Sequence, residues 1–199
     1  MKANVAWSTD ENAYLAGKAC AKKAVLDLIQ TKVAFIFSSV KYDQKALIDG
    51  AKEVLGSAPI IGCTSNGGIL VPDGYITSNN GFAGILAIGD PDTAVGVAGS
   101  AKMLTARETG RKVAIDAMNK VGTTFSPSYF FMIANPGEEE EYAKGIQDVI
   151  GDVPMFGGSS ADDDLTGKWK IFTNDGIFSE GVAVAFFYTN KKIMNEYTG

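Results

Sequence analysis

Residues 59–68 read PIIGCTSNGG, a short apolar run that passes directly into small polar residues and glycines. Residues 154–160 read PMFGGSS and repeat the start of this motif, with proline first, glycine fourth and serine seventh. The two copies are 95 residues apart (157 − 62 = 95), and the same offset relates Gly50 to Gly145. A repeat at a constant offset indicates an internal duplication.

The duplication predicts one domain over residues 1–199, built from two pseudo-equivalent halves of about 1–90 and 93–190. At the same offset, Phe35 falls on Phe130. The chain has 199 residues, of which 46% are hydrophobic and 21% charged, an ordinary composition for a globular protein. A chain of this length can form a single domain.

Hydrophobic patterning predicts the same order in each half: strand, helix, strand, helix, strand, a variable segment and a final strand. The predicted fold class is therefore α/β, with mixed sheets covered by helices. The first helix is expected to begin at a capping box, Ser8 with Glu11, and to run to about Gln30. The other helices are expected to begin near Asp43, Thr105 and Glu138. The expected strands are residues 5–7, 33–37, 59–61, 81–88, 94–98, 129–133, 154–156, 169–172, 177–178 and 181–188.

Two segments between the predicted strands are expected to have structures of their own. Residues 69–80 are predicted to be a polar excursion. Residues 174–176, Asn-Asp-Gly, lie between apolar runs and predict a β-hairpin. The glycine-rich loops are expected to start at Gly62 and Gly157, directly after their strands.

Charge and composition exclude several classes of function. Lys and Arg number 18 against 23 Asp and Glu, a formal net charge of −5 without a basic patch, so nucleic-acid binding is not expected. Without histidine, the chain lacks the commonest general base and transition-metal ligand. Cys20 and Cys63 are not in a paired spacing, so we expect no disulfide, no metal and no cofactor. The sequence shows no signal peptide and no apolar run long enough to span a bilayer, which predicts a cytoplasmic protein.

The small polar residues of the repeated motif are the candidate binding site. In α/β sheets, ligands bind in the crevice beyond the carboxyl ends of the strands, and a few polar groups there fix the ligand's orientation. Glycines that provide tight turns explain the pattern equally well. A phosphate-binding loop is excluded, because Gly67 is followed by Gly68 and not by Lys. The predicted ligand-binding residues are Cys63, Thr64, Ser65, Asn66, Ser159, Ser160 and Asp162.

Two other chemistries have weaker support. A hydrolase could use Cys63 or Ser65 as its nucleophile, but without histidine the base would have to be a lysine or a carboxylate. Residues 162–164, three consecutive aspartates, begin like a calcium loop, yet Thr173 stands where the glutamate is needed. These acids form either a solvated loop or acceptors for a ligand amino group. We predict no catalytic and no metal-binding residue.

Four motifs, taken together, resemble the N-terminal domain of the FIST family, the F-box and intracellular signal transduction proteins. The resemblance covers nearly the whole chain. It implies a sensory input domain that binds small ligands, with amino acids suggested. The motifs are Val5–Ser8 before an alanine-rich helix, Phe35–Ser38, Pro59–Gly67, and Met155–Asp163 followed by Trp169, Phe172 and Gly181.

The resemblance also implies partners. FIST domains accompany histidine kinases, chemotaxis transducers and cyclic-dinucleotide enzymes in bacteria, so a signalling output protein or domain of these kinds is expected. Some relatives are described as haem-binding nitric oxide sensors, but a chain without histidine excludes a histidine-ligated haem. We therefore expect a non-enzymatic sensor with a small polar ligand between its halves. A hydrolase-like enzyme and a structural interaction module are the alternatives.

Overall fold

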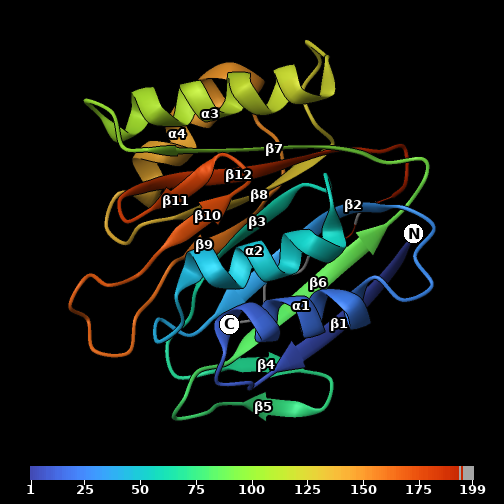
Figure 1. Ribbon diagram of the computed structural model, residues 1–199. Coiled ribbons are helices and arrows are strands. Elements are labelled where there is room, and N and C mark those ends of the chain that lie inside the picture. Colours follow the sequence, from blue (N-terminus) through green and yellow to red (C-terminus); the bar gives the residue numbers. More distant parts are fainter. Residues whose placement is uncertain (193, 195–199) are drawn as a thin grey trace.

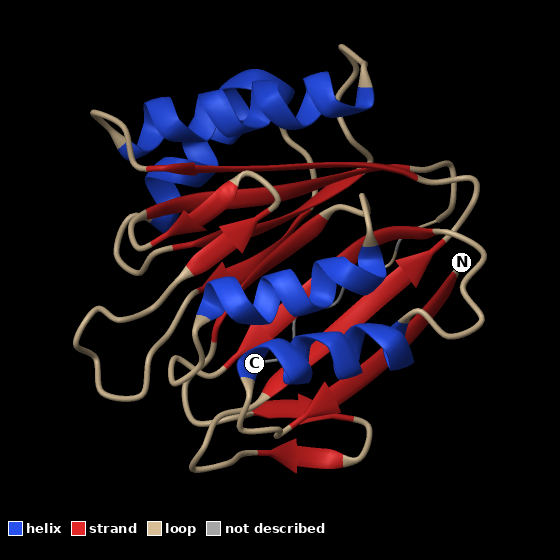
Figure 2. Ribbon diagram, in the orientation of Figure 1, coloured by secondary structure: helices blue, strands red, loops and turns tan. Residues whose placement is uncertain are grey.

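The computed structural model describes residues 1–192 and 194, so residues 193 and 195–199 of the predicted domain lie outside the described part. Two β-sheets pack face to face, and each carries two helices on its outer face (Figure 1, Figure 2). The layers follow the order helix, sheet, sheet, helix. The predicted α/β class, with mixed sheets covered by helices, is confirmed.

The first sheet has the strand order β1-β6-β2-β3-β10-β11. Strands β2 and β3 are parallel, and the other neighbouring pairs are antiparallel. Helices α1 and α2 cover the outer face, which is turned to the viewer in Figure 1. The elements are β1 (Lys2–Ser8), α1 (Ala13–Ala24), β2 (Thr31–Ser38), α2 (Gln44–Leu55), β3 (Ile60–Thr64), β6 (Ala83–Gly89), β10 (Ile171–Thr173) and β11 (Gly176–Phe178).

The second sheet has the strand order β7-β12-β8-β9, with β8 and β9 parallel. Helices α3 and α4 cover its outer face. A separate hairpin, β4–β5, forms its own two-stranded sheet. The elements are β4 (Ile69–Val71), β5 (Gly74–Ile76), β7 (Ala94–Ala101), α3 (Ala106–Val121), β8 (Tyr129–Ala134), α4 (Glu139–Ile150), β9 (Met155–Ser159) and β12 (Gly181–Tyr188).

Three apolar clusters hold the layers together. The inner cluster lies between the two sheets and includes Phe35, Ile61, Ile133 and Phe187. Each outer cluster lies between a sheet and its helices. Because removing apolar surface from water contributes roughly 25 cal/mol per Å², these clusters are the main stabilising contribution to the fold.

Glycines allow the two helices of each pair to touch. A Cβ on Gly17 of α1 would overlap the backbone of α2, and a Cβ on Gly50 of α2 would overlap that of α1. Gly110 of α3 and Gly145 of α4 have the same relation. The repeat of Gly50 at Gly145 therefore reflects close helix packing.

The order of strands relates the two sheets. Without the hairpins, β1-β6-β2-β3 and β7-β12-β8-β9 each run first, last, second, third along their part of the chain. Hairpin β10–β11 follows β9 in sequence but pairs with β3 in the first sheet. This correspondence agrees with a duplication, which stays a prediction from the sequence.

The prediction for the first helix is wrong at both ends. The helix begins after Asn12, whose side chain caps it, while Ser8 remains the last residue of β1. It ends at Ala24 and not near Gln30. The turn behind it holds Asp27 at φ 59°, a left-handed conformation through which an α-helix cannot continue.

The glycine motifs lie inside strands, which corrects the predicted loop starts. Strand β3 continues to Thr64 and β9 to Ser159, so Gly62 and Gly157 are strand residues. A Cβ on either glycine would overlap a carbonyl of the neighbouring strand, and such close backbone approach requires glycine. The prediction of a plain polar excursion over residues 69–80 is also wrong, since this segment contains hairpin β4–β5.

The correspondence of Phe35 with Phe130 is wrong by one residue. The first glycine of each motif pairs with a residue of the neighbouring strand. These partners are Ile36 in β2 and Met132 in β8, which are 96 residues apart (132 − 36 = 96). The counterpart of Phe35 is therefore Phe131, and the two rings contact each other between the sheets at a centroid distance of 5.0 Å. A one-residue shift in a strand moves a side chain to the opposite face of the sheet.

Candidate functional site

The segments that follow β3 and β9 meet at one edge of the molecule. Ala161 N donates to Thr64 O at 3.0 Å, and Thr64 Oγ1 donates to Ala161 O at 2.7 Å. Gly67 N donates to Asp163 Oδ1 at 3.0 Å. The two motifs, far apart in sequence, thus form one continuous surface, which we call the rim (residues 64–68 and 159–164).

Three predicted residues of the rim, Thr64, Ser160 and Asp162, are buried and hold the backbone. The Ser160 hydroxyl donates to Ala134 O at 3.3 Å. The Asp162 carboxylate accepts hydrogen bonds from Leu165 N and Lys168 N, both at 2.7 Å. Because these groups are buried and bonded to the backbone, their role in the structure is to shape the loop after β9.

Other predicted residues lie at the surface of the rim. Asn66 and Ser159 are exposed, and Ser65 is half-buried and donates to Gly68 O at 2.9 Å. The Ser159 hydroxyl donates to the Glu139 carboxylate. The side-chain amide of Asn66 has no hydrogen-bond partner in the described part of the chain. Asn66 is therefore the predicted residue whose polar groups are most available to a ligand.

Glu139 adds a negative charge next to the rim, which the sequence analysis did not include. Burial opposes ionisation of its carboxyl, but hydrogen bonds from Ser159 and from the backbone N–H of Gly137 lower its pKa below the usual value. The carboxylate is thus ionised at neutral pH. Its place at the start of α4, two residues after the Pro136-Gly137 turn, was the sequence feature that could have indicated it.

Cys63 does not lie on the rim surface. Its side chain is buried in the cluster between the sheets, and burial raises the pKa of its thiol to about 12. The thiol is therefore protonated at neutral pH, whereas a nucleophile must be a thiolate. This geometry gives no support to the hydrolase alternative at Cys63.

The three aspartates of the rim already have partners. Asp163 accepts from Gly67 N, and Asp164 accepts from Thr166 and Lys168. Among residues 1–192 and 194, no group of three His, Cys, Asp or Glu side chains is placed to hold a metal ion.

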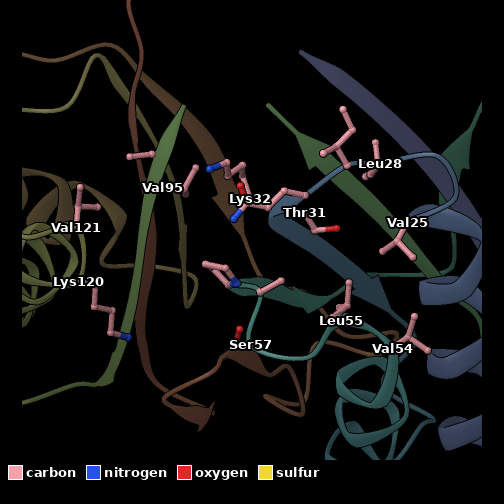
Figure 3. Close-up of a pocket in the computed structure, with 15 residues that line it drawn as sticks. Val25, Leu28, Thr31, Lys32, Val54, Leu55, Ser57, Val95, Lys120 and Val121 are labelled. Atoms are coloured by element: carbon pink, nitrogen blue, oxygen red, sulfur yellow. The ribbon is translucent and has the colours of Figure 1, made fainter. Parts of the chain in front are cut away.

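A cavity of about 630 Å³ lies away from the rim. It opens near the N-terminal ends of β2 and β7, between the end of α1 and the end of α3 (Figure 3). Most of its lining residues are aliphatic, but the surface that they present to the cavity is mainly polar, and Lys32 and Lys120 provide its positive charge. Lys120 forms an ion pair with Asp175 at 2.6 Å. None of the seven predicted site residues lines this cavity.

A second hollow, of about 320 Å³, lies between the sheets beside β9. We call it the inter-sheet groove. Every side chain in its lining is apolar or aromatic, which the sequence analysis did not anticipate. The aromatic residues that alternate along β2 and β8 were the sequence feature that could have indicated this groove. The lining residues are Phe35, Phe37, Leu86, Ile88, Tyr129, Phe131, Phe156 and Phe187.

The fold and the rim define an α/β domain of paired sheets with polar loops at one edge. In the described part of the chain, no helix is both long and apolar enough to cross a membrane.

The family described as the FIST N domain matches residues 32–199, and because this match covers most of the chain, the protein belongs to the FIST N domain family. A search of curated proteins returned no match. The family places the chain among sensory domains of signal transduction.

Proposed function

We propose that the chain is a sensory input domain that binds a small polar ligand, of the amino-acid kind, at the rim. The observation that carries this proposal is the hydrogen-bonded junction of the two motifs at Thr64 and Ala161. It brings an available amide, Asn66, into the same surface as Ser159 and the acidic groups of Asp163 and Glu139.

The chemistry of the rim suits a ligand with an amino group. Carboxylates accept charge-assisted hydrogen bonds from an ammonium group, and these bonds are stronger than neutral ones. Asp163 and Glu139 provide the carboxylates, and Asn66 can both donate and accept. The buried Ser160 and Asp162 fix the backbone on which these groups stand. The proposed site involves no cofactor, metal or catalytic step.

Signalling follows if the ligand favours one arrangement of the rim. The rim joins β3 of the first sheet to the loop after β9 of the second sheet. A ligand that contacts both motifs more strongly in one relative position of the sheets shifts the population toward that position. We propose that a cytoplasmic output protein or domain, such as a histidine kinase, a chemotaxis transducer or a cyclic-dinucleotide enzyme, responds to that shift.

A thermal-shift screen of the purified chain against amino acids and related metabolites tests the proposal. A ligand at 100 times its Kd stabilises the native state by about 2.7 kcal/mol, which raises Tm by roughly 5–10 °C for a protein of this size. Asn66→Ala is expected to weaken binding of the identified ligand at least tenfold, without changing the Tm of the ligand-free protein. Lys32→Ala, in the 630 Å³ cavity, is the matched control and should bind normally.

Two results would contradict the rim as the site. One is a ligand whose affinity is lost in Lys32→Ala but unchanged in Asn66→Ala, because it would place binding in the large cavity. The other is a screen in which no polar metabolite raises Tm, which would favour the interaction-module alternative.

A further inference from the structure

Strand β9 ends the second sheet and has no neighbour on its outer side in the described chain. All its residues are exposed except Phe156, which is half-buried. Strand β3, its counterpart at the 95-residue offset, is buried at every position, and β10 pairs with it. An open sheet edge presents unpaired N–H and C=O groups and can receive a strand from another chain.

The backbone hydrogen bonds show which groups of β9 are open. Toward β8, Pro154 O accepts a hydrogen bond at 3.0 Å and Ser160 N donates one at 2.9 Å. Successive residues of a strand direct their amides to opposite sides, so Met155, Gly157 and Ser159 direct theirs to the outer edge. These three residues provide the pairing groups for a further strand.

On β3 the equivalent groups are occupied. Thr64 N donates to Lys170 O at 2.9 Å, and Ile60 N donates to the Asn174 side chain at 2.6 Å. Thr64 is the counterpart of Ser159 on β9 (159 − 64 = 95). The molecule thus contains this strand edge twice: at β3 it is paired with β10, and at β9 it is unpaired.

The side-chain space beside the two edges differs in the same way. At β3, Phe172 of the hairpin lies against Gly62, and Ile171 fills the space between the sheets. At β9 that space is the inter-sheet groove of about 320 Å³. A Cβ on Gly158 would meet no atom within 4 Å, whereas its counterpart Cys63 is buried. Apolar side chains of an added strand could therefore enter the groove without displacing any part of the chain.

Neither hairpin of the chain is available to fill the open edge. Hairpin β10–β11 is already paired with β3. Hairpin β4–β5 is held on the face of the first sheet, where Ile69 packs against Gly84 and the Asp73 carboxylate accepts a hydrogen bond from Trp7 Nε1 at 3.0 Å. Neither hairpin in the described part of the chain is therefore the occupant.

We propose that β9 and the inter-sheet groove form a docking site for a β-hairpin of a partner protein. The partner strand lies antiparallel to β9, as β10 does to β3, with a large apolar side chain over Gly157 and alternate apolar side chains in the groove. Main-chain hydrogen bonds provide affinity in such strand addition, and the side-chain pockets provide specificity. The docking site does not depend on the ligand proposed for the rim.

The hairpin that already pairs with β3 provides the sequence of the probe. A fluorescent peptide of residues 169–180, cyclised to hold the hairpin conformation, contains the strand that β3 already accepts. Cyclisation is needed because an isolated hairpin is only marginally stable in water. We expect wild-type protein to bind this peptide, and hydrogen exchange to slow at Met155, Gly157 and Ser159 in the complex.

Gly158→Glu tests where the peptide binds. The added carboxylate enters open space in the free protein, so the fold is kept, but it projects from the same face of β9 as Phe156, which lines the groove, and the hairpin would cover that face. We expect at least tenfold weaker binding, with Gly158→Ser as the matched control within about twofold of wild type. A peptide carrying Phe172→Asp should bind as weakly as wild-type peptide does to Gly158→Glu.

Three outcomes would overturn the proposal. No binding of the cyclised peptide at millimolar concentration would show that the edge accepts no such hairpin. Binding unaffected by Gly158→Glu would place the peptide elsewhere, including by exchange with the hairpin on β3. Self-association of the unliganded chain that Gly158→Glu abolishes would make a second copy, and not a partner protein, the occupant.

Discussion

Hairpins β4–β5 and β10–β11 have similar sequences and different neighbours. ILVPDGYI (residues 69–76) and IFTNDGIF (residues 171–178) both begin with isoleucine and both carry Asp-Gly at the fifth and sixth positions. At the second position, Phe172 is fully buried and Leu70 is 83% exposed. The shared residues therefore specify the turn, whereas the strand edge that is within reach determines the pairing.

The largest difference between the hairpins is expected at that second position. Phe172→Ala removes a buried ring that packs against Gly62 and should reduce the free energy of unfolding by about 3–5 kcal/mol. Leu70→Ala changes an exposed side chain and should cost no more than about 0.5 kcal/mol. Urea unfolding of both variants measures the difference. Equal losses would mean that β10–β11 is not held by burial.

The next difference concerns the strands beneath the hairpins. Gly62→Ala places a methyl group against the β2 carbonyl and the Phe172 ring, and should destabilise by about 1–3 kcal/mol. Gly158→Ala meets open space and should leave the free energy of unfolding unchanged or raise it by about 0.4–1 kcal/mol. Thermal unfolding of the pair provides the measurement. A large loss in Gly158→Ala would show that the space beside β9 is filled in the free protein.

A smaller effect is expected at the turn of β10–β11. The Asn174 side chain accepts from Ile60 N at 2.6 Å and donates to Ala58 O at 3.3 Å. Asn174→Ala leaves a buried amide without a partner and should cost about 1.5 kcal/mol. Asn174→Asp keeps the acceptor and should recover most of this loss at neutral pH. If the aspartate variant is as unstable as the alanine variant, the hydrogen bond to Ile60 is not the important one.

The smallest effect is expected at the shared aspartate. Asp175 forms an ion pair with Lys120 at 2.6 Å, and both side chains are more than a third exposed. Such pairs contribute about 0.2–1 kcal/mol and weaken with salt, so Asp175→Asn should lose little, and less still in 1 M NaCl. Asp73→Asn keeps an acceptor for Trp7 Nε1 and should show no dependence on salt. A loss in Asp175→Asn that is insensitive to salt would point to its bond with Gly99 N instead.

Much of the fold could be predicted from local patterns. The last strand, Gly181–Tyr188, and the cap at Thr105 agree with the predictions because a continuous apolar run and a capping hydroxyl act within their own segment. The start of α1 could not be predicted in this way, because Ser8 and Asn12 are both good caps and pairing of β1 with β6 retains Ser8 in the strand. Hairpin β4–β5 was missed because its side chains alternate weakly in polarity.

The candidate site was predictable in its composition and not in its detailed contacts. The repeat at a constant offset made it possible to select Ser65, Asn66 and Ser160 together, although their strands, β3 and β9, belong to different sheets. Their actual partners, such as Ala134 O for the Ser160 hydroxyl, are backbone atoms distant in sequence and leave no pattern. The inner position of Cys63 likewise depends on the strand continuing past Gly62. Whether a ligand binds at the rim stays a prediction.

The crossing of β10–β11 into the first sheet has a consequence for how the chain folds. Ile61 pairs with Thr173, which is 112 residues away (173 − 61 = 112). Pairings over such distances slow folding, because a long loop must close before the contact forms. On a ribosome, the N-terminal sheet therefore keeps an uncovered edge at β3 until synthesis has passed residue 178. The first sheet, most of which is synthesised early, therefore waits for a hairpin that is synthesised late, and its open edge is exposed to aggregation for most of that time.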